Sequence, residues 1–455
     1  MKNVLLCIAT FALGCPFAFG QAQYKVLWNF AGAPNDGSAP EGSLVLDHAG
    51  NLYGTSFTGG STTATVCFPY GCGTVFELSP NQDGTWTETV LYSFCSNYSN
   101  SQCLDGSSPQ AGLVLDPKGD LYGTTTHGGN QLCEHTSFGC GTVFKISRPS
   151  APSGEWTEKV LYNFCTTQAN NNCSDGSLPI SQLTFDSSGN LYGTTSTGGT
   201  SVANAGTVFE LSHGVKRWTE TVLYSFCSLG NDDACPDGAE PLAGATFDKS
   251  GNLYGTTNRG GSQKNTGSGT VYKLSPGANG WSETVVFVFA YPFGHGEGPA
   301  GTVSFDALGN LFSTGSGGGQ SGAGTVLRLS PNGGGNVRSF SFNGKNGSAP
   351  TAGVLIDSKT ATIYGTTFQG GPAGGGTAFQ LVAPAQESVL YDFCSQQGCT
   401  DGAGPSSLIT DKSGNLYGTA KVGGASNAGV VFEIIPQART ISQHAAVGSL
   451  LENGH

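Results

Sequence analysis

Seven residues that could bind a ligand recur along the chain, each followed by glycine and each four residues before a proline. They are Asp36, Asp105, Asp175, Asp237, His295, Asn346 and Asp401. A ring of such side chains could hold an amine or a cation, and Ca²⁺ would need about six to eight oxygen ligands there. Asp-Gly is also ordinary turn chemistry, in which the carboxylate accepts hydrogen bonds from nearby backbone N–H groups. No DxDxDG-type run accompanies these residues, so the turn interpretation is favoured and no cofactor is predicted.

A second group of polar residues could carry acid–base chemistry. His127 and Arg259 stand just before the Gly-Gly of their repeats, His295 replaces an aspartate of the recurring set, and Glu134 and His135 are singular loop residues. A lone His or Arg in a loop is usually solvated, so these are weak catalytic candidates. No nucleophile elbow, HExxH or phosphate loop is present, and no carboxyl pair stands out as a glycosidase pair would. Whether the protein is an enzyme therefore stays open.

Cysteines supply the third kind of chemistry. Twelve follow the first twenty residues and fall in six close pairs: Cys67/Cys72, Cys95/Cys103, Cys133/Cys140, Cys165/Cys173, Cys227/Cys235 and Cys394/Cys399. No pair has CxxC spacing with a second pair nearby, which makes a zinc site a poor interpretation. We predict six local disulfides and no metal.

The elements that must position these residues repeat with them. The phrase at 189–199, GNLYGTTSTGG, has seven complete or degenerate copies, whose Tyr or Phe stands at 53, 122, 192, 254, 312, 364 and 417. Each repeat contains four β-type runs, as in GLVLD (112–116), NLYGTT, GTVFEL (206–211) and WTETVLYSF (218–226). Four short strands per repeat indicate the blades of an all-β propeller, because each sheet needs neighbours to cover its faces. Helix is expected to be almost absent.

The two ends of the repeat region predict how the ring closes. The segment 24–30, YKVLWNF, is a fourth-strand sequence with no preceding three, and 407–435 supplies three strands with no fourth. Pairing them gives a seven-bladed propeller of four-stranded blades, closed by the N-terminal strand. We assign residues 21–436 to the propeller and 437–455 to a C-terminal tail.

The loops after the second and fourth strands of every blade must emerge on one face, which we call the braced face because all six cysteine pairs lie in those loops. Loop length varies there, whereas the D-x-x-G turns opposite stay short. Binding residues usually ride on loops held by a rigid scaffold. Aromatic residues in these loops, Phe68, Tyr70, Tyr98 and Phe138, are expected to be exposed and could stack on sugars.

A recurring Trp-(Thr/Ser)-Glu opens the outer strands at Trp86, Trp156, Trp218 and Trp281. We expect the tryptophans to pack between elements and the glutamates to be solvated. The alternative, a catalytic role for these glutamates, has no further support in the sequence.

Charge and targeting signals bound the environment. The formal net charge is −12, with no Lys/Arg cluster, which argues against nucleic acid and anionic membranes as partners. Lys2, an apolar run over 4–13 and the small residues Ala18 and Gly20 predict a signal peptide over residues 1–20. No later run is long enough to span a membrane. A secreted, periplasmic or cell-surface monomer is expected.

The repeat phrase GNLYGTT…GG…GTVF, which recurs over residues 24–435, resembles the GloVer (Gloeobacter–Verrucomicrobia) tandem-repeat family of exported bacterial proteins. The resemblance implies an exported, propeller-like protein and assigns no activity or catalytic residue. The segment 437–455 lacks the apolar span and basic end of the sorting anchors that such proteins often carry.

These observations favour a non-catalytic binding or interaction module whose ligand is an extracellular carbohydrate or a protein partner. The alternatives are a propeller enzyme that acts on polysaccharide as a hydrolase or lyase, and a structural surface protein. A shallow aromatic groove would favour binding, and a deep pocket with two carboxyls would favour the enzyme.

Overall fold

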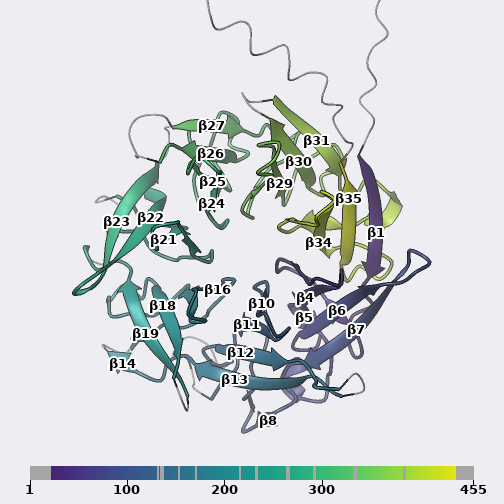
Figure 1. Ribbon diagram of the computed structural model, residues 1–455, viewed down its shortest axis with the longest axis horizontal. Coiled ribbons are helices and arrows are strands. Elements are labelled where there is room, and N and C mark those ends of the chain that lie inside the picture. The colour runs from purple at the N-terminus through teal and green to yellow at the C-terminus, as the bar shows by residue number, and fades with distance from the viewer. Residues whose placement is uncertain are drawn as a thin grey trace, which may run out of the picture.

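The computed structural model describes residues 22–436 except 131–132, 134–137, 152–153, 170–171, 215–216, 231–233, 263–266, 291–293, 332–336 and 383–385. Seven antiparallel sheets stand around a central axis, as the predicted propeller requires (Figure 1). In the described residues the helical elements are two single 3₁₀ turns, η1 (Thr65–Cys67) and η2 (Gln397–Cys399). The predicted fold class is confirmed.

Six blades are built from four strands in chain order, the innermost first. Blade 1 is β3 (Val45–Leu46), β4 (Leu52–Ser56), β6 (Thr74–Pro80) and β7 (Trp86–Ser93); blade 2 is β10 (Val114–Leu115), β11 (Leu121–Thr125), β12 (Thr142–Ser147) and β13 (Thr157–Asn163); blade 3 is β16 (Thr184–Phe185), β17 (Leu191–Thr195), β18 (Thr207–His213) and β19 (Trp218–Ser225). Blade 4 is β20 (Thr246–Phe247), β21 (Leu253–Thr257), β22 (Gly267–Gly277) and β23 (Gly280–Ala290); blade 5 is β24 (Ser304–Phe305), β25 (Leu311–Gly315), β26 (Thr325–Leu329) and β27 (Arg338–Ser341); blade 6 is β28 (Leu355–Ile356), β29 (Ile363–Thr367), β30 (Thr377–Val382) and β31 (Gln386–Asp392).

Blade 7 joins the two ends of the chain. Its strands are β33 (Ile409–Thr410), β34 (Leu416–Val422), β35 (Val430–Ile435) and β1 (Gln23–Asn29), with β32 (Ala403–Pro405) also paired to β34. β1 runs antiparallel to β35, with Tyr24 opposite Ile434 and Asn29 opposite Val430. Figure 1 shows the purple β1 beside the yellow β35. The closure predicted from the two ends of the repeat region is confirmed.

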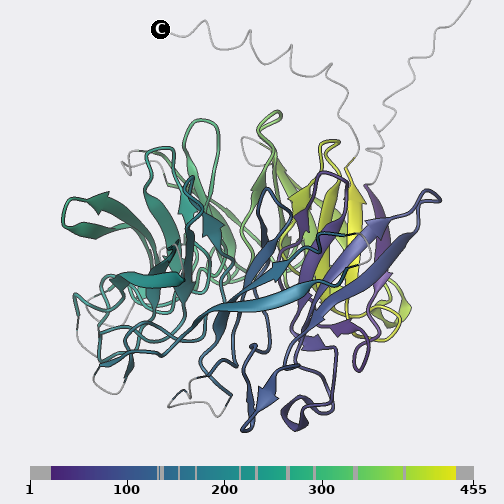
Figure 2. The ribbon, with the colours of Figure 1, turned by 60° about the horizontal axis from the view of Figure 1, so that its bottom comes forward.

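Among the described residues, three short two-stranded β-ladders lie in the loops. β2 (Gly37–Ser38) pairs with β5 (Thr58–Gly59), β8 (Tyr98–Ser99) with β9 (Gln102–Cys103), and β14 (Gln168–Ala169) with β15 (Asn172–Cys173). In Figure 2 the β8 region and the other long loops lie at the bottom of the ring and the tight turns at the top. The bottom is the braced face.

The glycine of the recurring LYGT phrase makes room for the next strand's aromatic residue. A Cβ on Gly193 would lie 2.7 Å from Phe209 Cζ and 2.9 Å from Leu183 Cδ2, which is closer than real Cβ contacts come. Phe209 is fully buried in the core between blades 2 and 3. In blade 5 the glycine and the aromatic are replaced together, by Ser313 and Leu327.

The threonine after that glycine joins each blade to the next. Thr55 Oγ1 donates to the carbonyl of Ala111 at 2.8 Å, from blade 1 to the segment that enters blade 2. The same contact recurs seven times and ends with Thr419, which donates to Gly42 across the closure. The others are Thr124 to Ser181, Thr194 to Ala243, Thr256 to Gly301, Thr314 to Ala352 and Thr366 to Ser406.

The recurring tryptophans also pack across blade junctions, as expected. Trp156 of blade 2 lies over Tyr53 of blade 1, with ring centroids 6.1 Å apart. Trp218 over Tyr122, Trp281 over Tyr192 and Trp86 over Tyr417 repeat this arrangement, and the last of these spans the ring closure. At these four junctions the start of the outermost strand of one blade packs against the second strand of the blade before it.

Candidate binding face

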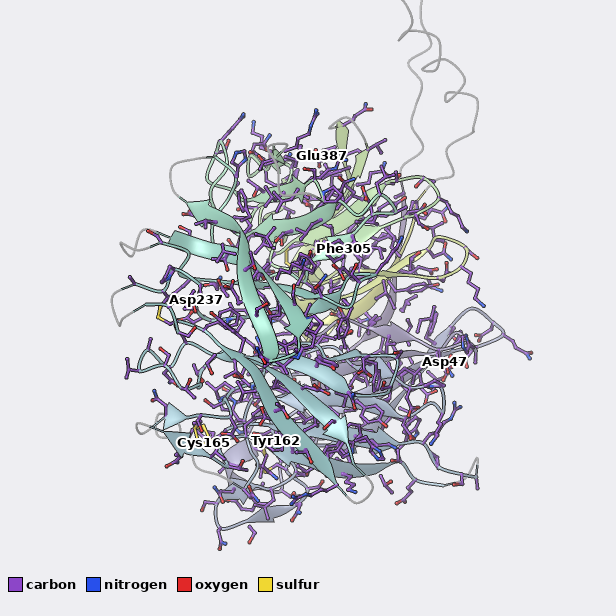
Figure 3. All side chains as sticks on the ribbon, turned by 60° about the vertical axis from the view of Figure 1, so that its left-hand side comes forward. Asp47, Tyr162, Cys165, Asp237, Phe305 and Glu387 are labelled. Atoms are coloured by element: carbon purple, nitrogen blue, oxygen red, sulfur yellow. A yellow bond between two sulfur atoms is a disulfide. The ribbon has the colours of Figure 1, made fainter. Side chains whose placement is uncertain are left out.

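All six predicted disulfides are formed: Cys67–Cys72, Cys95–Cys103, Cys133–Cys140, Cys165–Cys173, Cys227–Cys235 and Cys394–Cys399. They lie in the loops after second or fourth strands. Figure 3 shows Cys165 and Asp237 on one side of the ring and Asp47, in the turn between the first two strands of blade 1, on the other. Disulfides in this number are typical of proteins that fold outside a reducing cytoplasm.

Two disulfides of blade 1 pack against each other, which the sequence did not indicate. The sulfurs of Cys67, Cys72, Cys95 and Cys103 all lie within 4.8 Å of one another, and Cys72 Sγ is 4.0 Å from Cys103 Sγ. All four residues are buried. In blade 2 the sulfurs of Cys133, Cys140 and Cys173 make a similar group. The loop after the second strand is thus fixed to the loop after the fourth strand of the same blade.

Aromatic side chains stand on the fixed loops. Phe68 and Tyr70, between Cys67 and Cys72, are 73% and 74% exposed, and Phe138 in blade 2 is 59% exposed. Tyr98 differs from the expectation: it is half-buried against the sulfur cluster, and its hydroxyl lies 3.1 Å from Thr65 Oγ1. Tyr98 therefore joins two loops instead of facing solvent.

The three weak catalytic candidates lie apart. His127 belongs to blade 2, Arg259 to blade 4 and His295 to the segment entering blade 5. Burial lowers the pKa of His127, whose ring meets Phe138 edge-on. Arg259 Nη1 lies 3.2 Å from Glu240 Oε1, and His295 Nδ1 lies 3.1 Å from Ser339 Oγ. Each has a local partner, and blade 3 separates His127 from Arg259; Glu134 and His135 lie outside the described residues.

The recurring aspartates act as local clamps. Asp105 Oδ2 accepts hydrogen bonds from the Tyr92 hydroxyl at 2.7 Å and from the backbone and hydroxyl of Ser96 at 2.9 and 3.1 Å. Tyr92 ends the outer strand of blade 1, so the clamp fixes the start of the disulfide loop. Asp175, Asp237 and Asp401 repeat this set of donors.

The other members of the recurring set differ in detail. Asp36 accepts from the backbone N–H of Ala31 and Gly37, and Asn346 Oδ1 accepts from the backbone of Asn343. These contacts fit the turn interpretation of the motif. In the described residues, the groups of three or more potential metal ligands within 4.8 Å of one another consist of cysteines.

The glutamates of the Trp-x-Glu motif are not solvated, contrary to expectation. Glu88, Glu158, Glu220 and Glu283 are half-buried, and one carboxyl oxygen of each is buried. Burial, and then the charge of Asp105, raises the pKa of Glu158 to about 8. Each of these glutamates lies between two exposed residues of its outer strand, so its polar type and its sequence neighbours gave no sign of this burial.

A shallow, open groove of about 340 Å³ runs along the outer wall where the ring closes. Trp28 and Lys25 of β1 line one side, and Gly84, Thr85 and Trp86 line the other. The residues that line the groove include no carboxylate and no histidine, so the groove lacks the acid–base pair of a glycosidase.

Seven antiparallel blade sheets, six of four strands and one of five, and a repeat-based junction define the chain as a β-propeller repeat protein. It belongs to the Gloeobacter/Verrucomicrobia repeat family, whose model matches residues 12–174 and 245–450. No curated protein sequence matches the chain. No helix in the described part of the chain combines the length and the hydropathy needed to cross a bilayer.

Similar solved structures include a protein of unknown function from Dyadobacter fermentans, with 12% identity and a TM-score of 0.45, covering 91% of this chain and 98% of that one. A chain of a mitotic checkpoint complex has 10% identity and a TM-score of 0.47, covering 96% of this chain and 98% of that one.

Proposed function

We propose that the protein is an exported, non-catalytic binding module that holds an extracellular carbohydrate on the braced face of blades 1 and 2. The observation that carries the proposal is the exposure of Phe68, Tyr70 and Phe138 on loops fixed by buried disulfides. Flat aromatic rings on a rigid support bind a partner without losing much conformational entropy. The acidic net charge disfavours anionic polymers and points to neutral glycans.

A protein partner is the second candidate, because two aliphatic side chains share this face. Val202, in the loop after β17, is 62% exposed, and Leu229, in the segment after β19, is 69% exposed. With the aromatic residues, they place exposed apolar side chains on loops from blade 1 to the junction of blades 3 and 4. Mixed aromatic and aliphatic anchors are common at protein interfaces.

The test is retention of the purified protein on a panel of neutral and acidic polysaccharides, with release of reducing or unsaturated ends measured in the same wells. We expect retention on a neutral glycan without product release. Phe68→Ala with Tyr70→Ala should reduce the affinity about 10-fold or more, since each stacked ring contributes on the order of 1 kcal/mol.

The matched control is Leu308→Ala. Leu308 is 79% exposed in the D-x-x-G turn of blade 5, on the opposite face, so its truncation should leave retention unchanged. Product release would replace the binding module by the enzyme. Equal losses of affinity in the Phe68/Tyr70 variant and in Leu308→Ala would show that the braced face is not the binding surface.

A further inference from the structure

Two blade junctions each place a buried aspartate near a half-buried glutamate of the following blade. Asp105, in the segment from blade 1 to blade 2, is 2% exposed, and its charge acts on the carboxyl of Glu158 on β13 of blade 2. Asp237, between blades 3 and 4, is fully buried, and its charge acts on the carboxyl of Glu283 on β23 of blade 4. Each aspartate already accepts three hydrogen bonds through Oδ2.

The other oxygens of these carboxyls lack donors. Among the described residues, nothing donates a hydrogen bond to Asp105 Oδ1, Glu158 Oε1, Asp237 Oδ1 or Glu283 Oε1, and all four atoms are buried. Buried acceptors without donors are costly, and two adjacent buried negative charges cost more. One hydrogen atom placed between the two carboxyls relieves both costs.

We propose that each of these two junctions binds one proton from solvent, held by the glutamic acid and donated to Oδ1 of the aspartate, so that a carboxyl–carboxylate hydrogen bond fastens neighbouring blades. The aspartate is the acceptor because its other oxygen, Oδ2, already accepts three hydrogen bonds. The glutamic acid stays neutral because the motif gives it no cation. This role for the Trp-x-Glu motif is separate from ligand binding at the braced face.

The junctions that lack this pair use a different donor. Asn346 Nδ2 lies 3.4 Å from Glu387 Oε2 at the entry to blade 6, so an amide supplies the hydrogen atom. At the entry to blade 7, Tyr24 occupies the glutamate's register position and donates to the backbone carbonyl of Asp401. His295 meets Ser339 at the entry to blade 5. Each of these junctions is bridged by a group that carries its own hydrogen.

The electrostatic surroundings agree with the geometry. Burial first, and the aspartate second, raises the pKa of Glu158 to about 8 and that of Glu283 to about 7. The other titratable groups that face the pairs are tyrosines with raised pKa values: Tyr92 for the first pair, and Tyr224 and Tyr272 for the second. In the described residues neither pair contains a salt bridge to a basic side chain.

Asp175 with Glu220 and Asp36 with Glu88 are weaker versions of the same arrangement. Their glutamates also have a buried oxygen without a donor and pKa values raised to about 8 and about 7. Both oxygens of each aspartate, however, accept backbone hydrogen bonds. The test therefore concentrates on the first two junctions.

The sign of the pH effect follows from the raised pKa values. A glutamic acid that keeps its proton in the fold stabilises it fully below its ordinary pKa, and this contribution is lost as pH rises toward 7 and 8. The Tm of the full chain should therefore rise on acidification from about pH 8.5 to about pH 5. In the double variant E158Q/E283Q, whose amides donate without titrating, about half of this rise should disappear, because Glu220 and Glu88 still have raised pKa values.

The control is Glu297→Gln, in the segment entering blade 5, where the junction has no carboxyl pair; it should keep the wild-type rise. A double variant that keeps the full rise, or a wild-type Tm that falls on acidification, overturns the proposal. Infrared spectra of the wild type provide a second measurement that needs no variant. A protonated-carboxyl band at about pH 6 that disappears near pH 9 supports the proposal, and its absence at pH 6 overturns it.

Discussion

At the scale of single residues, the repeat phrase is a set of contacts in which each side chain meets a specific neighbour. The glycine admits an aromatic ring, the first threonine donates to the next blade, and the tyrosine receives a tryptophan from that blade. The threonine contact occurs in all seven blades and the tryptophan contact at four junctions, so the phrase recurs because the junctions are built from a shared set of contacts. Two substitutions separate these roles.

Gly193→Ser should destabilise the protein by about 1–3 kcal/mol, because the added atoms overlap Phe209 and Leu183. Adding Phe209→Leu recreates the Ser313/Leu327 combination of blade 5 and should recover part of the loss. Denaturant unfolding measures both variants. If the free energy of unfolding falls more in the double variant than the summed losses of the two single variants, the coupling between these positions is disproved.

Thr194→Val should cost about 1–3 kcal/mol, because the fully buried hydroxyl that reaches the carbonyl of Ala243 is lost while the carbonyl stays buried. The control is Thr219→Val on the outer strand of the same blade, where the side chain is exposed. Comparable Tm losses for the two variants would show that the junction contact contributes nothing specific.

At the scale of elements, the disulfide loops of blades 1 and 2 behave as pairs. Two loops from the same blade share one buried sulfur cluster, so each loop is held by its own bond and by the neighbouring one. The loop between blades 3 and 4 differs, because its disulfide, Cys227–Cys235, belongs to neither sulfur group found in the described residues.

Replacing both cysteines of Cys67–Cys72 or of Cys95–Cys103 by alanine should cost about 2–3 kcal/mol each from loop entropy. Removing both bonds together should deviate from the sum, because the second removal acts on packing already loosened by the first. Removal of Cys227–Cys235 together with either of these disulfides should lower the free energy of unfolding by the sum of the two separate losses. Additive values in all combinations, measured by thermal unfolding, would contradict the coupling of the two loops.

The sequence predicted the elements better than the contacts between them. Turn residues, strand periodicity and the unmatched ends of the repeat were sufficient for the blades, the closure and the six disulfides, because these follow from local spacing. The burial of Glu158 against Asp105 and the position of Tyr98 were missed. Those contacts join side chains from adjacent repeats or separate loops, and spacing within one repeat holds no information about them.

At the scale of the whole molecule, stability depends on one seam, which is the pairing of β1 with β35 in blade 7. Six blades are each built from one continuous stretch of chain, whereas blade 7 pairs β35 with β1 from the other end of the propeller. The packing of Trp86 over Tyr417 and the hydrogen bond from Thr419 to Gly42 join this blade to blade 1. Without β1, blade 7 loses its outermost strand and β35 becomes an exposed edge, which favours association with other chains.

Deletion of residues 22–30 should therefore lower Tm more than any single substitution above and should produce concentration-dependent aggregation. Lys25→Ala, which alters β1 only at an exposed contact with the Gly84 carbonyl, is the control and should stay monomeric. Size-exclusion chromatography and thermal unfolding distinguish the two. A monomeric deletion variant with an unchanged Tm would show that the seam does not hold the ring.

The position of β1 also determines when the ring can close during synthesis of the chain. Of the propeller strands, β1 is synthesised first and its partner β35 last. Nearly the whole chain is therefore made before β1 can pair with β35. Each intermediate blade can form as it emerges, but the circle stays open until the final repeat is complete. Newly made chains are thus exposed to capture by chaperones at one strand for the entire time of synthesis.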